Sequence, residues 1–172
     1  MTTILGIDPG SQTTGYGIIK LDGNHAEHIT HGHIRAGGRS QAEALHIIYI
    51  SLHKIIAEHG PDEAAIERVF MHKNADSALK LGQARGAAIV ACAEQGIALH
   101  EYTANQVKLA TVGRGHAAKQ QVQHMVKVLL CLPELPQADA ADALAVALCH
   151  GHTRDTLAKV PGVSGVRRGR LR

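Results

Sequence analysis

The stretch TTILGIDPGSQTTGYGIIKLDG, residues 2–23, predicts the start of a β-sheet. The apolar run at residues 4–7 is typical of a strand that ends near Asp8, and residues 9–11, Pro-Gly-Ser, are typical of a turn. A second strand is expected at residues 14–21. The stretch therefore predicts an antiparallel hairpin whose first strand ends in a carboxylate.

The rest of the chain predicts three more strands and five helices. Apolar residues recur at helical spacing between short strand-like runs, and Asn74 and Thr103 stand where helix N-caps are expected. The expected fold is α/β: a five-stranded mixed sheet, an antiparallel meander plus parallel strands, with helices on both faces. Strands are expected at 28–36, 62–70 and 97–102, and helices at 41–59, 75–95, 103–110, 117–130 and 137–150.

Composition limits the class of protein. A chain of 172 residues predicts one domain, placed at residues 1–155, and a net charge of +3 permits a nucleic-acid partner without requiring one. The three cysteines lack CxxC spacing and are interpreted as small buried apolar residues of a reducing compartment. Neither a signal peptide nor an apolar run of ~20 residues is apparent, so a cytoplasmic location without a membrane partner is expected.

The last segment, residues 156–172, predicts a flexible basic tail. Four arginines crowd its final six residues: Arg167, Arg168, Arg170 and Arg172. One interpretation is a disordered, solubilising end, and the other is an arm that becomes ordered on a polyanion.

Four acidic residues are the candidate catalytic site. Asp8 and Glu67 each end an apolar strand-like run, while Asp139 and Asp142 are three residues apart and share one face of a helix. Taken singly, each has an ordinary explanation, such as a turn start, an ion pair, a helix-dipole contact or a solvent-exposed side chain. Taken together, they can converge on one point if the two strands are neighbours.

Convergence of these carboxylates predicts a divalent-cation site. Two unit charges ~5 Å apart repel by about 3 kcal/mol at an effective dielectric near 20. A group of four would therefore raise its own pKa values or bind cations. Oxygen ligands without cysteine or clustered histidine favour Mg²⁺ or Mn²⁺, and two such ions suit phosphodiester hydrolysis.

Four segments resemble the RuvC family of Holliday junction resolvases: LGIDPGSQTTGYGII (5–19), AIERVFMHKNADSALKLGQARGAAIVA (65–91), QVQHMVK (121–127) and PQADAADALAVALCH (136–150). The resemblance covers almost the whole chain and is looser at residues 23–58 and after Thr153. It implies a ribonuclease H-like fold and a homodimer that cuts four-way DNA junctions by paired symmetric nicks in recombination and repair. It also implies two Mg²⁺ per active site, replaceable by Mn²⁺, and cooperation with a branch-migration motor.

The resemblance assigns roles to individual residues. The catalytic, metal-binding acids of the family fall on Asp8, Glu67, Asp139 and Asp142. Lys119 is implied to be a further catalytic residue, and both Lys119 and Lys108 are implied to lie near the active site and the DNA backbone. Phe70 matches an aromatic residue that stacks on a base. The full set of predicted DNA contacts is Phe70, Lys73, Arg85, Lys108, Arg114 and Lys119.

Several of these residues have a second explanation. Phe70 can fill the core, and scattered lysines usually form a solvated surface. Lys119 opens a helix, where a positive charge is unfavourable unless an anion lies nearby. Gly82 and Gly86 stand inside a helix at a cost of ~1 kcal/mol each, which close packing would explain, either within the monomer or across a twofold dimer.

Three other functions compete with junction cutting. A sugar-kinase or actin-like ATPase also begins with a strand, an aspartate and a hairpin, but 172 residues are too few for its two lobes. A junction-binding protein without catalysis and a nuclease for RNA–DNA hybrids are the others. The histidine pairs at 31/33 and 150/152 lack a third partner at ligand spacing and are interpreted as surface or core residues.

Overall fold

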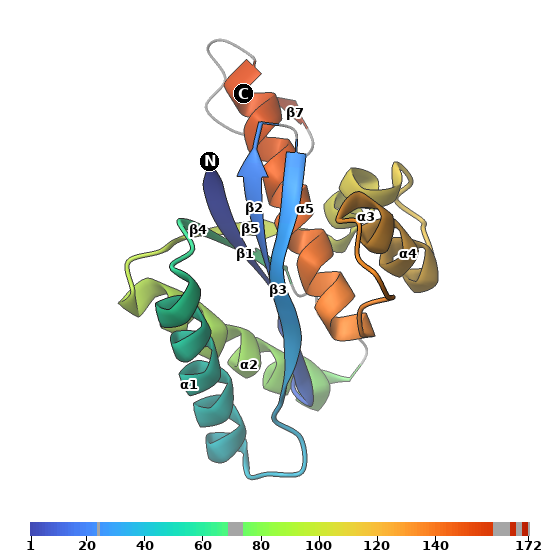
Figure 1. Ribbon diagram of the computed structural model, residues 1–172. Coiled ribbons are helices and arrows are strands. Elements are labelled where there is room, and N and C mark those ends of the chain that lie inside the picture. The colour runs from blue at the N-terminus through green and yellow to red at the C-terminus, as the bar shows by residue number, and fades with distance from the viewer. Residues whose placement is uncertain (24, 69–73, 160–165, 168–169, 172) are drawn as a thin grey trace.

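The computed structural model describes residues 1–23, 25–68, 74–159, 166–167 and 170–171. It contains a five-stranded sheet with helices on both faces, and a separate two-stranded ribbon (Figure 1). The sheet strands are β1 (Thr2–Asp8), β2 (Thr13–Asp22), β3 (His25–Arg35), β4 (Glu63–Glu67) and β5 (Ala98–Tyr102). The helices are α1 (Gln41–His59), α2 (Ala75–Glu94), α3 (Ala104–Val112), α4 (Lys119–Leu129) and α5 (Ala138–Lys159), and the ribbon is β6 (Val166–Arg167) with β7 (Arg170–Leu171).

The strand order confirms the predicted mixed sheet. The order is β3-β2-β1-β4-β5, in which β1, β2 and β3 pair antiparallel, whereas β4 pairs parallel with both β1 and β5. Ile7 of β1 lies opposite Ile66 of β4. The next residues along the two strands are Asp8 and Glu67, so the two carboxylates belong to the same end of the sheet.

Each face of the sheet buries its own apolar core. Side chains of β1 alternate between the faces, with Ile4 in one core and Leu5 and Ile7 in the other. Helices α1 and α2 cover the face to which Leu5 points, and α5 covers the opposite face with α3 and α4 beside it (Figure 1). The apolar residues are mostly Ala, Ile, Leu and Val, because the chain has one Phe and no Trp.

Three glycines on the α5 side of β1 and β2 allow that helix to lie directly on the sheet. Gly6 and Gly17 are paired across the two strands, and Gly15 is paired with Asp8. A Cβ at Gly6 would lie 2.1 Å from the carbonyl oxygen of Ala143, and one at Gly15 would lie 1.9 Å from that of Asp139. Any side chain here would push α5 away, so this glycine row sets the height of the helix above Asp8.

Several element boundaries differ from those expected. The last helix ends at Lys159, nine residues beyond the predicted end, and therefore passes through the predicted domain limit at residue 155. Helix α4 begins at Lys119 rather than at residue 117, and β3 begins at His25. Strand β4 ends at Glu67 instead of continuing to residue 70. In the part of the chain that is described, no helix is both long and apolar enough to cross a membrane.

The prediction that all three cysteines are buried is wrong for one of them. Cys92 and Cys149 are buried, as expected, but Cys131 is exposed. Cys131 directly follows Leu130, the C-cap residue of α4, and has a φ of 50°. A helix commonly ends with a residue in this left-handed conformation, which turns the chain away from the helix and here leaves the thiol at the surface.

Candidate active site

Three of the four predicted acids line one open cavity. Asp8 comes from the end of β1, Glu67 from the end of β4, and Asp142 from the second turn of α5. The cavity has a volume of about 170 Å³, and its remaining described walls are Ala104, Val107, Lys108, Lys119 and Val122. The carboxylates thus converge because parallel β1 and β4 end together while α5 crosses the adjacent glycine row.

Asp139 lies one helical turn before Asp142 on α5 but is not among the described residues that line the cavity. Its carboxylate accepts a hydrogen bond of 2.8 Å from the Gln137 amide. The charge of Asp139 nevertheless raises the pKa values of Asp8 and Asp142, so it belongs to the same electrostatic cluster.

Two lysines supply the positive charge of the cavity. Lys119 Nζ lies 3.3 Å from Asp142 Oδ2, although its side chain remains 81% exposed. This carboxylate is the anion that explains a lysine at the first position of α4, and it raises the pKa of Lys119. Lys108 is half-buried in α3, and its charge lowers the pKa values of Glu67 and Asp142, partly opposing their rise.

Burial is the main reason that the acids of this site hold protons tightly. Burial, followed by the charges of Glu67 and Asp142, raises the pKa of Asp8 from 3.8 to about 8. Burial also raises the pKa values of Glu67 and Asp142. A bound divalent cation would remove the cost of ionising these carboxylates, so the donor set suits a hard cation such as Mg²⁺.

Without divalent cations, the thermal stability contributed by this site should fall as pH rises from about 4 to about 8. A carboxyl whose pKa is higher in the folded protein than in the unfolded chain contributes stability at low pH, and that stability is lost as the pH passes through the folded-state value. The measurement is the difference in Tm between wild type and Asp8→Asn in a chelating buffer. The Tm of the variant should increase relative to that of wild type as the pH rises. A Tm difference that does not change with pH would contradict the explanation.

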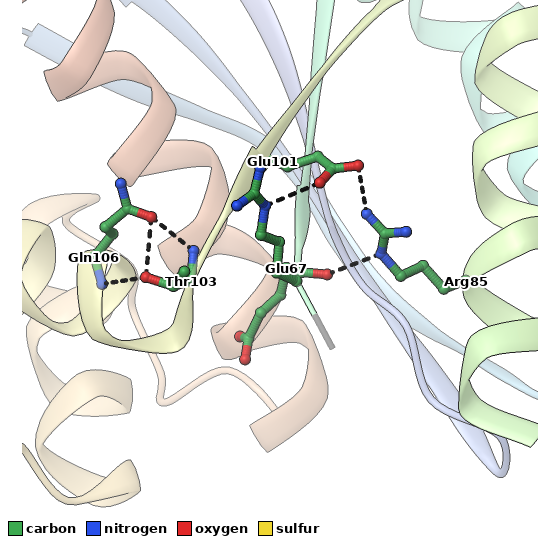
Figure 2. Close-up of polar contacts among 6 residues, drawn as sticks. Glu67, Arg85, Glu101, Thr103 and Gln106 are labelled. Carbon is green, nitrogen blue, oxygen red and sulfur yellow. Dashed lines mark hydrogen bonds and ion pairs between the residues drawn. The ribbon is translucent and has the colours of Figure 1, made fainter. Parts of the chain in front are cut away.

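An ion-pair network behind the cavity holds Glu67 in place (Figure 2). On β5, Glu101 accepts hydrogen bonds from Arg85 at 2.7 Å and from Arg68 at 2.9 Å. Arg85 also donates to the backbone oxygen of Glu67 at 3.4 Å, and the Glu67 carboxylate points away from this network. Arg85 therefore joins α2 to the ends of β4 and β5 and positions the end of β4 that carries Glu67.

Arg114, Phe70 and Lys73 complete the set of predicted DNA contacts. Arg114 is exposed in the loop between α3 and α4. Thr103 is the N-cap of α3, and its hydroxyl accepts a hydrogen bond from the Gln106 backbone N–H in a capping box (Figure 2). The same helix carries Lys108. Phe70 and Lys73 lie outside the described residues.

Two features of the structure were not predicted from the sequence. Glycines at 6, 15 and 17 have a spacing that could have indicated close helix packing, because Gly is costly within strands. His150 was interpreted as lacking partners, but the fold brings it within 2.6 Å of Glu63 and against His100. Its partners are separated from it by 87 and 50 residues, so spacing along the chain could not reveal them.

Comparisons with known proteins match this architecture. Residues 4–150 match the family model described as "Crossover junction endodeoxyribonuclease RuvC". Proteins of that name from Tolumonas auensis and Hahella chejuensis are 58% and 54% identical to this chain, each covering all of both sequences. The Thermus thermophilus RuvC structure in complex with a Holliday junction substrate superimposes with a TM-score of 0.85 at 32% identity, covering 91% of this chain and 96% of that one.

The structural match also confirms the expected ribonuclease H-like fold, with its five-stranded mixed sheet and helices on both faces. The family model, the full-length relatives and the solved structure all agree on one assignment. The chain belongs to the RuvC family of crossover junction endodeoxyribonucleases.

Proposed function

We propose that this protein resolves four-way DNA junctions by hydrolysing one phosphodiester bond at each of two symmetric positions. The observation that carries the proposal is the convergence of half-buried Asp8, Glu67 and Asp142 on a cavity that also holds two lysines. Members of this family are metal-dependent nucleases. The cavity lies at the carboxyl ends of β1 and β4 and is open, so a DNA backbone can reach it.

The donor set fits two Mg²⁺ ions, with Mn²⁺ as a substitute. Asp8, Glu67, Asp139 and Asp142 are the proposed ligands, and all donate oxygen, the ligand atom that Mg²⁺ prefers. When bound, such ions lower the pKa of the attacking water and stabilise the leaving oxygen. The raised pKa values of three of these acids support the assignment, because a cation would relieve their mutual repulsion.

The lysines are proposed to bind the phosphate groups of the DNA. Lys119 pairs with Asp142, and a cation at the acids would compete for that carboxylate and leave Lys119 for the scissile phosphate. Lys108 lines the same cavity and can contact the neighbouring phosphate. Arg114, exposed on the adjacent loop, is placed to extend this contact surface, whereas Arg85 is already engaged by Glu101.

A homodimer is proposed through the outer face of α2. Leu79 and Val90 on this helix are 63% and 56% exposed, and they share a face with Gly82 and Gly86 at helical spacing. Apart from the neighbouring backbone of α2 and the residues adjacent in sequence, no described atom lies within 4 Å of a Cβ built at either glycine. Packing against the described part of the chain thus does not explain the cost of two helical glycines, and close approach of the same helix from a second copy explains it.

Cleavage of defined substrates in Mg²⁺ tests the proposal. We expect paired nicks in a labelled four-way junction, little cutting of linear duplex, and little cutting of an RNA–DNA hybrid. Binding of the junction should weaken steeply with salt, because contacts to phosphates release counterions. The supporting readout is two symmetric products that disappear when Mg²⁺ is chelated.

Each alternative predicts a different outcome of the same experiment. Faster cutting of the hybrid would keep the fold and replace the substrate. Junction binding without nicks in Mg²⁺ or Mn²⁺ would indicate a non-catalytic binding protein, and ATP hydrolysis without DNA would indicate the ATPase. The base-stacking role of Phe70, the contact from Lys73, the basic tail, the branch-migration motor and the cytoplasmic location stay predictions.

A further inference from the structure

A second cluster of ligating side chains lies at the other end of the sheet from the acids. Glu63 begins β4, His100 lies within β5, and His150 lies in the middle of α5. One ligand atom from each of these residues lies within 4.8 Å of the other two. The three residues come from three elements that the core holds rigidly, so their proximity does not depend on a loop.

This Glu63–His100–His150 cluster is separate from the active site. Glu63 and Glu67 are the two ends of β4, and four residues of strand span ~13 Å. Along α5, His150 follows Asp142 by eight residues, or ~12 Å of helix. A ligand at the cluster is therefore too far from the acids to share one of their cations.

The side chains around the cluster hold its ligand atoms in place. The Tyr102 hydroxyl lies 2.8 Å from His150 Nδ1, so the other ring nitrogen, Nε2, faces Glu63. Arg154 Nε lies 3.2 Å from Glu63 Oε1 and leaves Oε2 facing the imidazoles. Contacts of this kind behind a histidine and a carboxylate are typical of protein metal sites, where they fix the ligand orientation.

The two imidazoles lie against each other. The rings of His100 and His150 are stacked with centroids 4.3 Å apart, and His150 is only 3% exposed whereas His100 is exposed. Tetrahedral Zn²⁺ with bonds of ~2.0–2.1 Å separates its ligand atoms by ~3.3 Å. To reach this spacing, the exposed His100 ring would rotate, and the 2.6 Å contact between His150 Nε2 and Glu63 Oε2 would lengthen as the metal takes the place of the shared proton.

We propose that Glu63, His100 and His150 bind Zn²⁺, with a water molecule as the fourth ligand. Two nitrogen donors and one carboxylate are a donor set that zinc prefers and that Mg²⁺ does not. The protein would then hold two chemically distinct cation sites, one with oxygen ligands only and one with mixed nitrogen and oxygen ligands. The zinc would cross-link β4, β5 and α5, the same helix whose first turns carry Asp139 and Asp142.

Thermal unfolding of the full-length Asp8→Asn protein with Zn²⁺ tests this site, because that variant weakens zinc binding at the acids. At a free Zn²⁺ concentration about 100-fold above Kd, we expect Tm to rise by roughly 5–10 °C. His100→Ala in this background should abolish the rise, and its own fold should persist because His100 is exposed. The matched control is His116→Ala, an exposed histidine of the α3–α4 loop, which should keep the rise.

Two further readouts separate a metal site from general stabilisation. Co²⁺ should give the strong visible absorption of a tetrahedral site, and His100→Ala should abolish it. Tyr102→Phe should weaken zinc affinity by ~10-fold or more through the loss of the contact that orients His150. Two results would overturn the proposal: no rise in Tm with Zn²⁺ in the Asp8→Asn protein, or a rise that persists after His100→Ala. The three residues would then be a hydrogen-bonded cluster closed by Arg154.

Discussion

The Asp8→Asn variant is expected to cut a four-way DNA junction at least ~10³-fold more slowly than wild type. Asp8 is the most central acid of the cavity: it ends β1, the middle strand, and its pKa responds to Glu67, Asp139 and Asp142. Asparagine keeps the shape but removes a negative charge from a site that has to hold divalent cations. The measurement is the single-turnover cutting rate in saturating Mg²⁺.

Junction binding distinguishes a catalytic defect from an unfolded protein. The variant should bind the junction about as tightly as wild type in a chelating buffer, because the lysines proposed to contact phosphate are unchanged. Asp22→Asn is the matched control, since Asp22 also ends a strand of the same sheet but is exposed. Retained cutting by Asp8→Asn, or an equal loss in Asp22→Asn, would refute the assignment.

The same variant should be more stable than wild type when no divalent cation is present. Wild type has to confine several partly ionised carboxylates in one cavity at neutral pH, and asparagine removes the most strongly perturbed of them. A gain in stability together with a loss of activity is the expected result for a group that function requires and folding does not. Saturating Mg²⁺ should reverse the order, because it stabilises only the protein with all four acids.

The Gly82→Leu variant is expected to be a folded monomer. Leucine favours the helix by about 1 kcal/mol relative to glycine, and a Cβ at this position meets no described atom, so the fold should persist. The branched side chain would, however, hold two α2 helices apart where the glycine allows contact. Analytical ultracentrifugation of both proteins measures the change in mass.

Loss of the dimer should change the products of junction cutting. A monomer brings one active site to the junction, so single nicks should replace paired symmetric ones. Lys54→Leu on α1 is the control, because it adds an exposed leucine to a different helix and should leave the dimer intact. If Gly82→Leu remains a dimer, the outer face of α2 is not the interface and its glycines need another explanation.

Much of the fold could be predicted because its signals are local. Helix α1 begins and ends where expected, since Ser40 and Glu43 form a capping box at its start and Gly60 takes the left-handed conformation at its end. The order of strands and helices also left few topologies open, because crossover connections favour parallel neighbours. The sequence did not predict that α5 continues from residue 150 to Lys159. Histidines, a glycine and threonines weaken the helical pattern there, but they do not end the helix.

The identities of the four acids and their positions at strand ends and on one helix face were determined by the sequence alone. Only the tertiary structure decided how close they come, because that distance depends on α5 lying directly on Gly6, Gly15 and Gly17. It also decided that Arg85 holds Glu67 and that Glu63 meets His150. Hydrophobic periodicity specifies which face of an element is buried, but contacts between distant polar groups depend on the spacing and register of packed layers, which no short stretch of chain encodes.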